Sequence, residues 1–174
     1  DVAITLILAW SLGKMISGLG TAEFIVKFLQ DMSFSASLVP AAVFLFGAFI
    51  SFSTGSSWGT FAIMMPLAIP MAHAFGIPFY IAVGAVLSGG LFGDHCSPIS
   101  DTTILSSTGA GCGLVEHIKT QLPYAAVNGT IAFIAYIITG LTGSEAALGF
   151  AVIALIVVMA VLNRISAARL AGKE

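Results

Sequence analysis

Eleven residues near the middle of the chain decide its fold: Gly93-Asp94-His95-Cys96-Ser97-Pro98-Ile99-Ser100-Asp101-Thr102-Thr103. They separate two apolar segments, residues 79–92 and 104–115. Each segment is shorter than the roughly 20 residues that a helix needs to cross a bilayer. We therefore predict one broken helix over residues 79–115, with an unwound centre.

The polar residues of this break are the strongest functional signal in the sequence. Pro98 opposes a regular helix through Asp94, and Ser100 or Asp101 can cap a helix that starts after the break. Ionisable side chains within a membrane segment are costly, so by default they mark a functional site. His95 and Asp101 also have plainer interpretations, as a buried imidazole and as a helix cap.

The composition places the whole chain in a membrane. Of the 174 residues, 58% are hydrophobic and 8% are charged, and the mean hydropathy is +1.06, whereas about a quarter of the residues of a soluble domain are charged. No Asp, Glu, Lys or Arg occurs in the 62 residues between Asp31 and Asp94. We predict an all-α polytopic membrane protein with residues 1–174 as a single transmembrane unit. The absence of a basic patch argues against nucleic acid as a partner.

A second polar interruption precedes the first. Apolar residues 38–52 and 61–75 flank the eight residues Ser53-Thr54-Gly55-Ser56-Ser57-Trp58-Gly59-Thr60. Two short limbs with a polar tip indicate a re-entrant hairpin over residues 38–75. Because irregular backbone at membrane depth must be covered by protein or line a cavity, we expect the tip to line a cavity and to face the break. The alternative is one long helix kinked at Pro66 and Pro70.

The remaining segments complete the membrane unit. Residues 2–12 are apolar and are expected to be the end of an incomplete first crossing. Residues 20–32 alternate apolar and charged positions at helical spacing, which is typical of an interfacial helix. Residues 122–141 and 146–162 are long enough to span. Basic residues follow the last span, so the positive-inside rule predicts a cytoplasmic C-terminus.

Two enzyme-like patterns compete with this interpretation. Gly55-Ser56-Ser57-Trp58-Gly59 matches the G-x-S-x-G nucleophile elbow, which requires a strand before the serine and a helix after it. Asp94-His95-Cys96 contains zinc-binding residue types, but adjacent residues do not converge on a metal as spaced motifs do. Neither pattern has its usual context. Cys96 and Cys112 are expected to be free thiols.

Residues 92–103 closely resemble the signature of NhaC-type sodium/proton antiporters. Ser56-Ser57-Trp58-Gly59-Thr60, Met65-Pro66, Ile69-Pro70 and Gly20-Thr21-Ala22-Glu23 resemble the same family, so the likeness extends over residues 18–136. The resemblance implies a secondary transporter of the ion-transporter superfamily, built from two inverted repeats, with this chain as the C-terminal half. It implies exchange of sodium for protons, although some relatives exchange malate for lactate or carry other solutes.

The expected site combines oxygens from the break and the tip. Na⁺ needs several oxygen ligands, and we expect them from Asp94, Ser97, Ser100 and Thr102 of the break and from Ser53, Thr54 and Ser57 of the tip, with Asp94 and Thr102 on the ion itself. His95 and Asp101 are further candidates. Asp94 follows a half-helix and is the expected proton carrier, whereas Asp101 precedes one and is expected to stay ionised. The rival interpretation is a structural or regulatory membrane subunit.

The expected context follows from the same resemblance. We expect a multi-pass protein of a bacterial or archaeal inner membrane that is not an enzyme and needs no cofactor, with Na⁺ and H⁺ as its transported ions. The expected partners are the lipid bilayer, the N-terminal repeat of the same protein and, in a homodimer, a second copy.

Overall fold

The computed structural model describes residues 7–8, 11–12, 14–15, 18–144 and 146–171. Most of the predicted segment 2–12 therefore lies outside the described residues. Within them every regular element is a helix, so the all-α prediction is confirmed. The elements are α2 (Thr21–Asp31), the 3-10 turn η1 (Ala36–Leu38), α3 (Val39–Thr54), α4 (Ser57–Ala74), α5 (Phe79–Cys96), α6 (Asp101–Gly109), α7 (Leu114–Thr142) and α8 (Ala146–Ala171).

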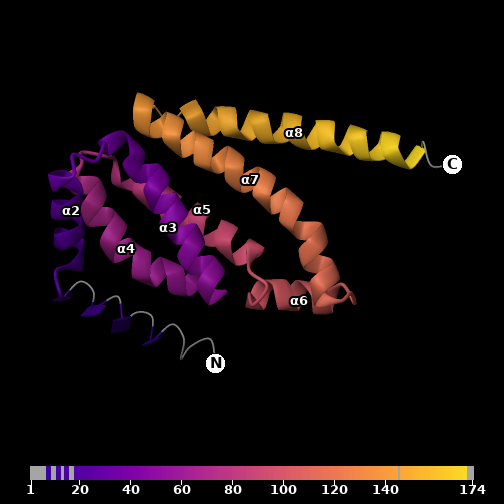
Figure 1. The fold of residues 1–174 in the computed structure, drawn as a ribbon, viewed down its shortest axis with the longest axis horizontal. Coiled ribbons are helices and arrows are strands. Elements are labelled where there is room, and N and C mark those ends of the chain that lie inside the picture. Colours follow the sequence, from indigo (N-terminus) through magenta and orange to yellow (C-terminus); the bar gives the residue numbers. More distant parts are fainter. Residues whose placement is uncertain (1–6, 9–10, 13, 16–17, 145, 172–174) are drawn as a thin grey trace.

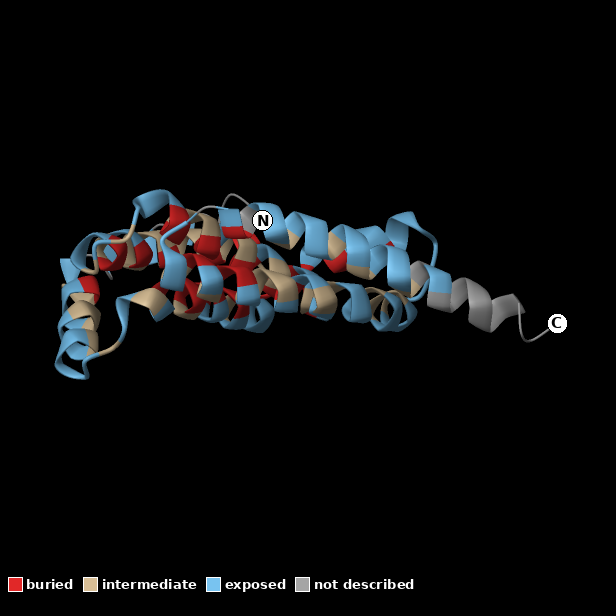
Figure 2. Cartoon of the chain, turned by 90° about the horizontal axis from the view of Figure 1, so that it is seen from above, coloured by how far each residue is buried: buried red, intermediate tan, exposed pale blue. Residues whose placement is uncertain are grey.

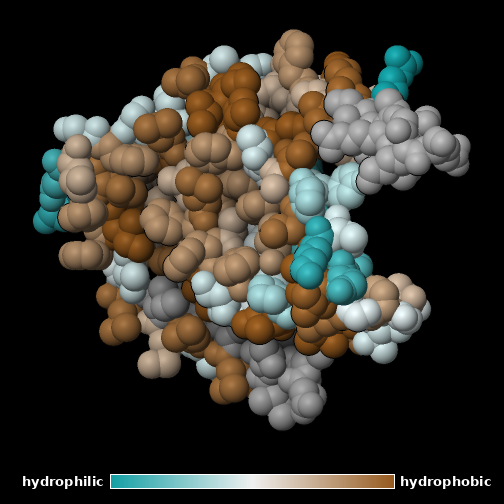
Figure 3. Space-filling view, turned by 45° about the vertical axis from the view of Figure 1, so that its right-hand side comes forward, coloured by the Kyte–Doolittle hydropathy of each residue, from teal (hydrophilic) through white to brown (hydrophobic). Residues whose placement is uncertain are grey.

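Among the described residues, three helical stretches are long and apolar enough to cross a membrane: Ala36–Thr54, Phe79–Cys96 and Leu114–Thr142. Together with the apolar surface visible in Figure 3, they confirm a polytopic membrane protein. The first two are longer than the apolar segments predicted from the sequence. Helix α3 includes Ser53 and Thr54. Their hydroxyls donate to the carbonyls of Phe49 and Ile50, at 2.8 and 2.9 Å, so both hydroxyls find an acceptor within the helix.

Helices α3, α4 and α5 form the packed centre of the molecule (Figure 1). Helix α2 lies against α4, and α7 packs on α3 and α5. Helix α8 turns back from the end of α7 and packs against it near that end, and the two helices then diverge (Figure 1). Buried residues concentrate in one part of the molecule, while exposed residues dominate the part that leads to the C-terminus (Figure 2). The centre is therefore where a protected polar site can form.

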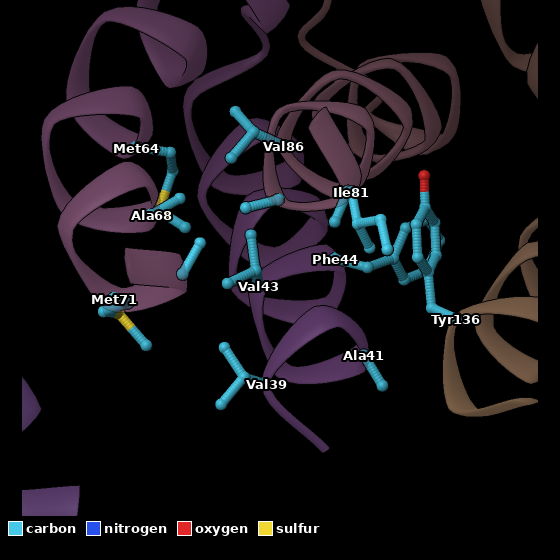
Figure 4. Packing of buried hydrophobic residues seen from close by; sticks show 13 residues of the cluster. Val39, Ala41, Val43, Phe44, Met64, Ala68, Met71, Ile81, Val86 and Tyr136 are labelled. Atoms are coloured by element: carbon cyan, nitrogen blue, oxygen red, sulfur yellow. The ribbon is translucent and has the colours of Figure 1, made fainter. Parts of the chain in front are cut away.

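The apolar core joins α3, α4, α5 and α7 (Figure 4). Phe44 of α3 is 1% exposed, and its ring lies 5.9 Å from that of Phe92 and 5.6 Å from that of Tyr136. Met64 and Met71 fill the space on the α4 side. These contacts fix α5, and hence the break that follows it, against the hairpin.

Glycines bring α3 and α5 into backbone contact. A side chain at Gly93 would collide with the Ala48 carbonyl and lie 2.8 Å from the Ser51 Cβ, and one at Gly89 would collide with the Phe44 carbonyl. Small residues permit such close approach between membrane helices. The end of α3 therefore lies directly on the last turns of α5.

The break is shorter than predicted. Helix α5 continues through Asp94 to Cys96, and only residues 97–100 are irregular before α6. Pro98 lacks the N–H that would bond to the Asp94 carbonyl, and the Ser97 N–H occupies that carbonyl instead, at 3.1 Å. The expectation that Pro98 unwinds the chain at Asp94 is therefore wrong, because the chain turns away at Ser97 before the proline ring can clash.

The second limb of the broken helix also ends earlier than predicted. Helix α6 ends at Gly109, and Gly111, with φ +64°, adopts the left-handed conformation that commonly ends a helix. The limb therefore does not reach residue 115. Helix α7 then begins at Leu114 and runs for 29 residues, with Pro123 inside it. The predicted span 122–141 is the greater part of this longer helix.

Candidate functional site

The Asp94 carboxylate is buried at the break and held by two hydroxyls. It is 1% exposed. The Ser100 Oγ donates to its Oδ1 at 2.7 Å, and the Thr102 Oγ1 donates to its Oδ2 at 3.0 Å. A buried carboxylate is costly unless it is paired or hydrogen-bonded. Since both hydroxyls come from the start of α6, the carboxylate of α5 joins the two half-helices across the break.

The hydroxyls of Ser100 and Thr102 also contact each other, at 2.7 Å. The three side chains thus form a ring with three short oxygen contacts. With Asp94 ionised, the two hydroxyl hydrogens serve two contacts and the third has none. With Asp94 protonated, every contact has a hydrogen. With one proton on Asp94 there are as many hydrogens as contacts in the ring. Without that proton one contact has no hydrogen, and a cation bound there could be coordinated by the oxygen lone pairs and balance the carboxylate charge.

The first turn of α6 is built to hold this geometry. Ser100 is the N-cap, and its Oγ accepts the Thr103 N–H at 3.4 Å, while its carbonyl accepts the Ile104 N–H at 3.0 Å. Asp101 occupies the first turn and is exposed. A carboxylate at this end of a helix is favoured by the macrodipole. Ser100 therefore has two roles: it caps the start of α6, and it donates a hydrogen bond to Asp94.

The hairpin tip meets the break, as the sequence predicts. The Ser97 Oγ donates to the Phe52 carbonyl at 2.8 Å. Gly55, with φ +66°, lies so close to the break that an added Cβ would be 2.7 Å from the Ile99 oxygen. The irregular part of the tip is only Gly55 and Ser56, because α3 ends at Thr54 and Ser56 caps α4 through the Gly59 N–H at 3.3 Å. The tip is thus a tight turn.

Six predicted site residues have no side-chain hydrogen bond to the Asp94 ring within the described part of the chain. Two of them are Ser97, which bonds to the hairpin, and the exposed Asp101. Ser53 and Thr54 are exposed and bond within α3. Ser57 is 6% exposed in the first turn of α4. His95 is exposed, with its Nδ1 2.8 Å from the Leu91 carbonyl. Their part in ion binding stays a prediction.

Neither enzyme-like pattern finds its required geometry. Ser57 follows helix α3 and opens helix α4, whereas the nucleophile elbow needs a strand before the serine. Asp94 is buried while the neighbouring His95 is exposed, so the two side chains do not converge on one metal.

Two buried hydroxyls at the site escaped the sequence analysis. Ser51 is fully buried, and its Oγ donates to the Gly90 carbonyl at 2.6 Å. Thr103 is 2% exposed, and its Oγ1 has no hydrogen-bond partner among the described residues. Ser51 stands inside an apolar run, where a lone hydroxyl is an ordinary helix residue. The only sequence feature that indicates the Ser51 contact is the series of glycines in α5, which lets α3 and α5 approach each other closely.

Comparison with known proteins shows the family. The family model described as the Na⁺/H⁺ antiporter family matches residues 1–141. An uncharacterized Na⁺/H⁺ antiporter of Haemophilus influenzae is 34% identical over 134 residues, which are 75% of this chain and 27% of that protein. The arginine/ornithine antiporter ArcD of Halobacterium salinarum is 33% identical over 122 residues, 70% of this chain and 25% of ArcD.

The Na⁺/H⁺ antiporter NhaC of Alkalihalophilus pseudofirmus is 35% identical over 91 residues, 52% of this chain and 20% of NhaC. The chain spans a third or less of the length of these curated relatives. No solved structure matches it significantly. The relatives are antiporters, and the predicted resemblance to NhaC-type proteins is confirmed. The chain belongs to the Na⁺/H⁺ antiporter family.

Proposed function

We propose that this chain contributes the ion-binding half of a sodium/proton antiporter, in which Asp94 binds either a proton or Na⁺. The observation that supports this most is the ring in which the buried Asp94 and Ser100 contact each other and the more exposed Thr102. When Asp94 is protonated, its carboxyl group can donate to the Thr102 Oγ1, and the Thr102 hydroxyl hydrogen is then free to serve the contact with Ser100. A cation that takes the place of the proton meets the two carboxylate oxygens and the two hydroxyl oxygens.

Competition for one carboxylate is sufficient for exchange. When Na⁺ binds, the proton of Asp94 must leave, because both cannot share the ring. When the proton returns, the hydroxyl hydrogens of Ser100 and Thr102 turn back into the ring and the Na⁺ loses its ligands. Each ion therefore displaces the other, and a conformational change that exposes the site alternately to the two sides converts this displacement into antiport.

The charges near the site favour a cation over an organic anion. No Lys or Arg occurs between Lys27 and Lys119, and the ring itself carries only acidic and hydroxyl groups. A buried carboxylate substrate would need a cationic partner to offset its desolvation. Malate and lactate carry such carboxylates, so they fit this half-site poorly. Arginine or ornithine exchange is the second candidate, because the ArcD relative is named for it and the carboxylate of each solute is accompanied by cationic groups of the solute itself.

We also propose what covers the exposed side of the site and in which membrane the protein lies. Asp101 and Thr102 are exposed on α6, and an exposed carboxylate inside a membrane must be covered by protein or water. We assign this cover to the N-terminal repeat of the same protein. The setting is a bacterial or archaeal inner membrane with the C-terminus in the cytoplasm, and a homodimer is compatible with it.

A transport assay tests the substrate. The intact transporter that contains this chain is reconstituted in liposomes, and gradients of Na⁺, arginine, malate and lactate are imposed one at a time while internal pH is followed. We expect the Na⁺ gradient alone to drive proton movement. Proton movement or exchange with an organic solute only would contradict sodium/proton antiport, and inactivity with all four solutes would favour a structural or regulatory subunit.

A further inference from the structure

The Ser51 hydroxyl donates its hydrogen bond to a neighbouring helix, although a hydroxyl on a membrane helix can be satisfied by a carbonyl of its own helix. In the described part of the chain, most of the Ser and Thr hydroxyls that donate to a backbone carbonyl do so within their own helix, as Ser53 and Thr130 do. The Ser51 Oγ instead crosses from α3 to the Gly90 carbonyl of α5, at 2.6 Å, and Ser51 has no exposed surface. Its hydroxyl therefore ties two helices together at a buried point.

The carbonyl that Ser51 contacts belongs to the turn that carries Asp94. Gly90 lies four residues before Asp94, so in the α-helical pattern its carbonyl accepts the Asp94 N–H. The same oxygen thus accepts one bond from within α5 and one from α3. Whatever shifts Ser51 also shifts the backbone from which the Asp94 side chain extends.

A second bond holds the other side of Asp94. The Ser97 Oγ donates to the carbonyl of Phe52, the residue next to Ser51, at 2.8 Å. The first bond is donated by α3 to α5, before Asp94, and the second is donated to α3 by Ser97, the C-cap of α5, after Asp94. Gly93, which has no side chain, allows the turn between them to lie on Ser51.

We propose that Ser51 is a positioning residue for Asp94 and forms, with Ser97, a two-point clamp that makes the end of α3 and the Asp94 turn of α5 one rigid body. This inference rests on the proposed exchange at Asp94. The side-chain hydrogen bonds of Asp94 run to Ser100 and Thr102 at the start of α6. The contact between Asp94 and α6 is therefore the one that opens and closes during exchange. The hairpin therefore keeps its position relative to Asp94 while the ring opens and closes.

The test compares hydroxyl-removing variants in the intact transporter. In Ser51→Ala we expect the apparent KM for Na⁺ to rise by about tenfold, as when a group that orients a metal ligand is removed, with the maximal rate nearly unchanged and the pH profile of exchange displaced. Ser88→Ala is the matched control. It removes another hydroxyl that links helices, because the Ser88 Oγ lies 2.8 Å from the Tyr136 hydroxyl, but it should leave the KM and the pH profile as they are.

Two further variants make the outcome decisive. Ser51→Cys leaves no void and keeps a weaker donor on a somewhat larger atom, so it should show the same kind of change even if Ser51→Ala folds poorly. Asp94→Asn, assayed in parallel, reports on the proposed function itself. If Asp94→Asn is inactive while both Ser51 variants match the wild type in KM and pH profile, the clamp is refuted and the exchange site stands. If Asp94→Asn exchanges normally, the proposed function fails first.

Discussion

Asp94→Asn is expected to abolish sodium/proton exchange by the intact transporter, with a loss of at least about 100-fold, while the protein stays folded. The amide is nearly isosteric with the carboxyl group and can still bond to Ser100 and Thr102. It cannot, however, release a proton or supply the negative charge that Na⁺ requires. The measurement is Na⁺-driven proton movement in liposomes, with the folded amount checked by size-exclusion chromatography.

Asp101→Asn is the matched control for this variant. Asp101 is exposed in the first turn of α6, and losing its charge should cost about 0.3–1 kcal/mol of helix-dipole interaction. We expect weaker Na⁺ affinity or lower stability, with exchange retained. If pH-dependent exchange survives in Asp94→Asn but disappears in a well-folded Asp101→Asn, the roles of the two carboxylates are reversed.

Gly93→Val should have the largest effect on folding. The first carbon of the new side chain would already collide with the Ala48 carbonyl and lie 2.8 Å from the Phe52 nitrogen, which are backbone atoms that cannot move aside alone. Overpacking of a well-packed interior costs about 1–3 kcal/mol or more. We expect a clear drop in melting temperature in detergent and a lower yield of monodisperse protein.

Gly109→Ala serves as the comparison, because nothing lies within 4 Å of the added carbon. Its melting temperature should stay close to that of the wild type. A Gly93→Val protein as stable as Gly109→Ala would show that α3 and α5 do not pack in backbone contact. The hydrogen bond from Ser51 to Gly90, and with it the proposed clamp at Asp94, would then be contradicted.

The sequence predicted the class of fold and the meeting of the two polar segments, because both follow from where polar residues interrupt apolar ones. It misplaced helix ends for a physical reason. Ser53 and Thr54 are residue types typical of loops, but here their hydroxyls bond to carbonyls of the preceding helical turn. Asp94 stays helical although Pro98 cannot donate to its carbonyl, because the Ser97 N–H donates to that carbonyl instead.

The candidate site was predicted in part. Asp94, Ser100 and Thr102 are recognisable by type and spacing, whereas Ser51 is not, since nothing local distinguishes it from a hydroxyl that bonds to its own helix. Its partner lies 39 residues away, and only the packing of α3 on α5 brings the two together. The boundary between α6 and α7 was missed as well, because the turn depends on the left-handed conformation of Gly111 rather than on a change in polarity.

Competition between Na⁺ and a proton at Asp94 is tested by Na⁺ binding to the purified intact transporter, measured by titration calorimetry at several pH values in buffers of different ionisation enthalpy. If Na⁺ and a proton compete for Asp94, the apparent Kd should rise as pH falls, approaching about tenfold per pH unit in the acidic range, with close to one proton released per bound Na⁺. Both effects should vanish in Asp94→Asn. Na⁺ binding that releases no proton and is independent of pH, or competition that persists unchanged in Asp94→Asn, would contradict the account.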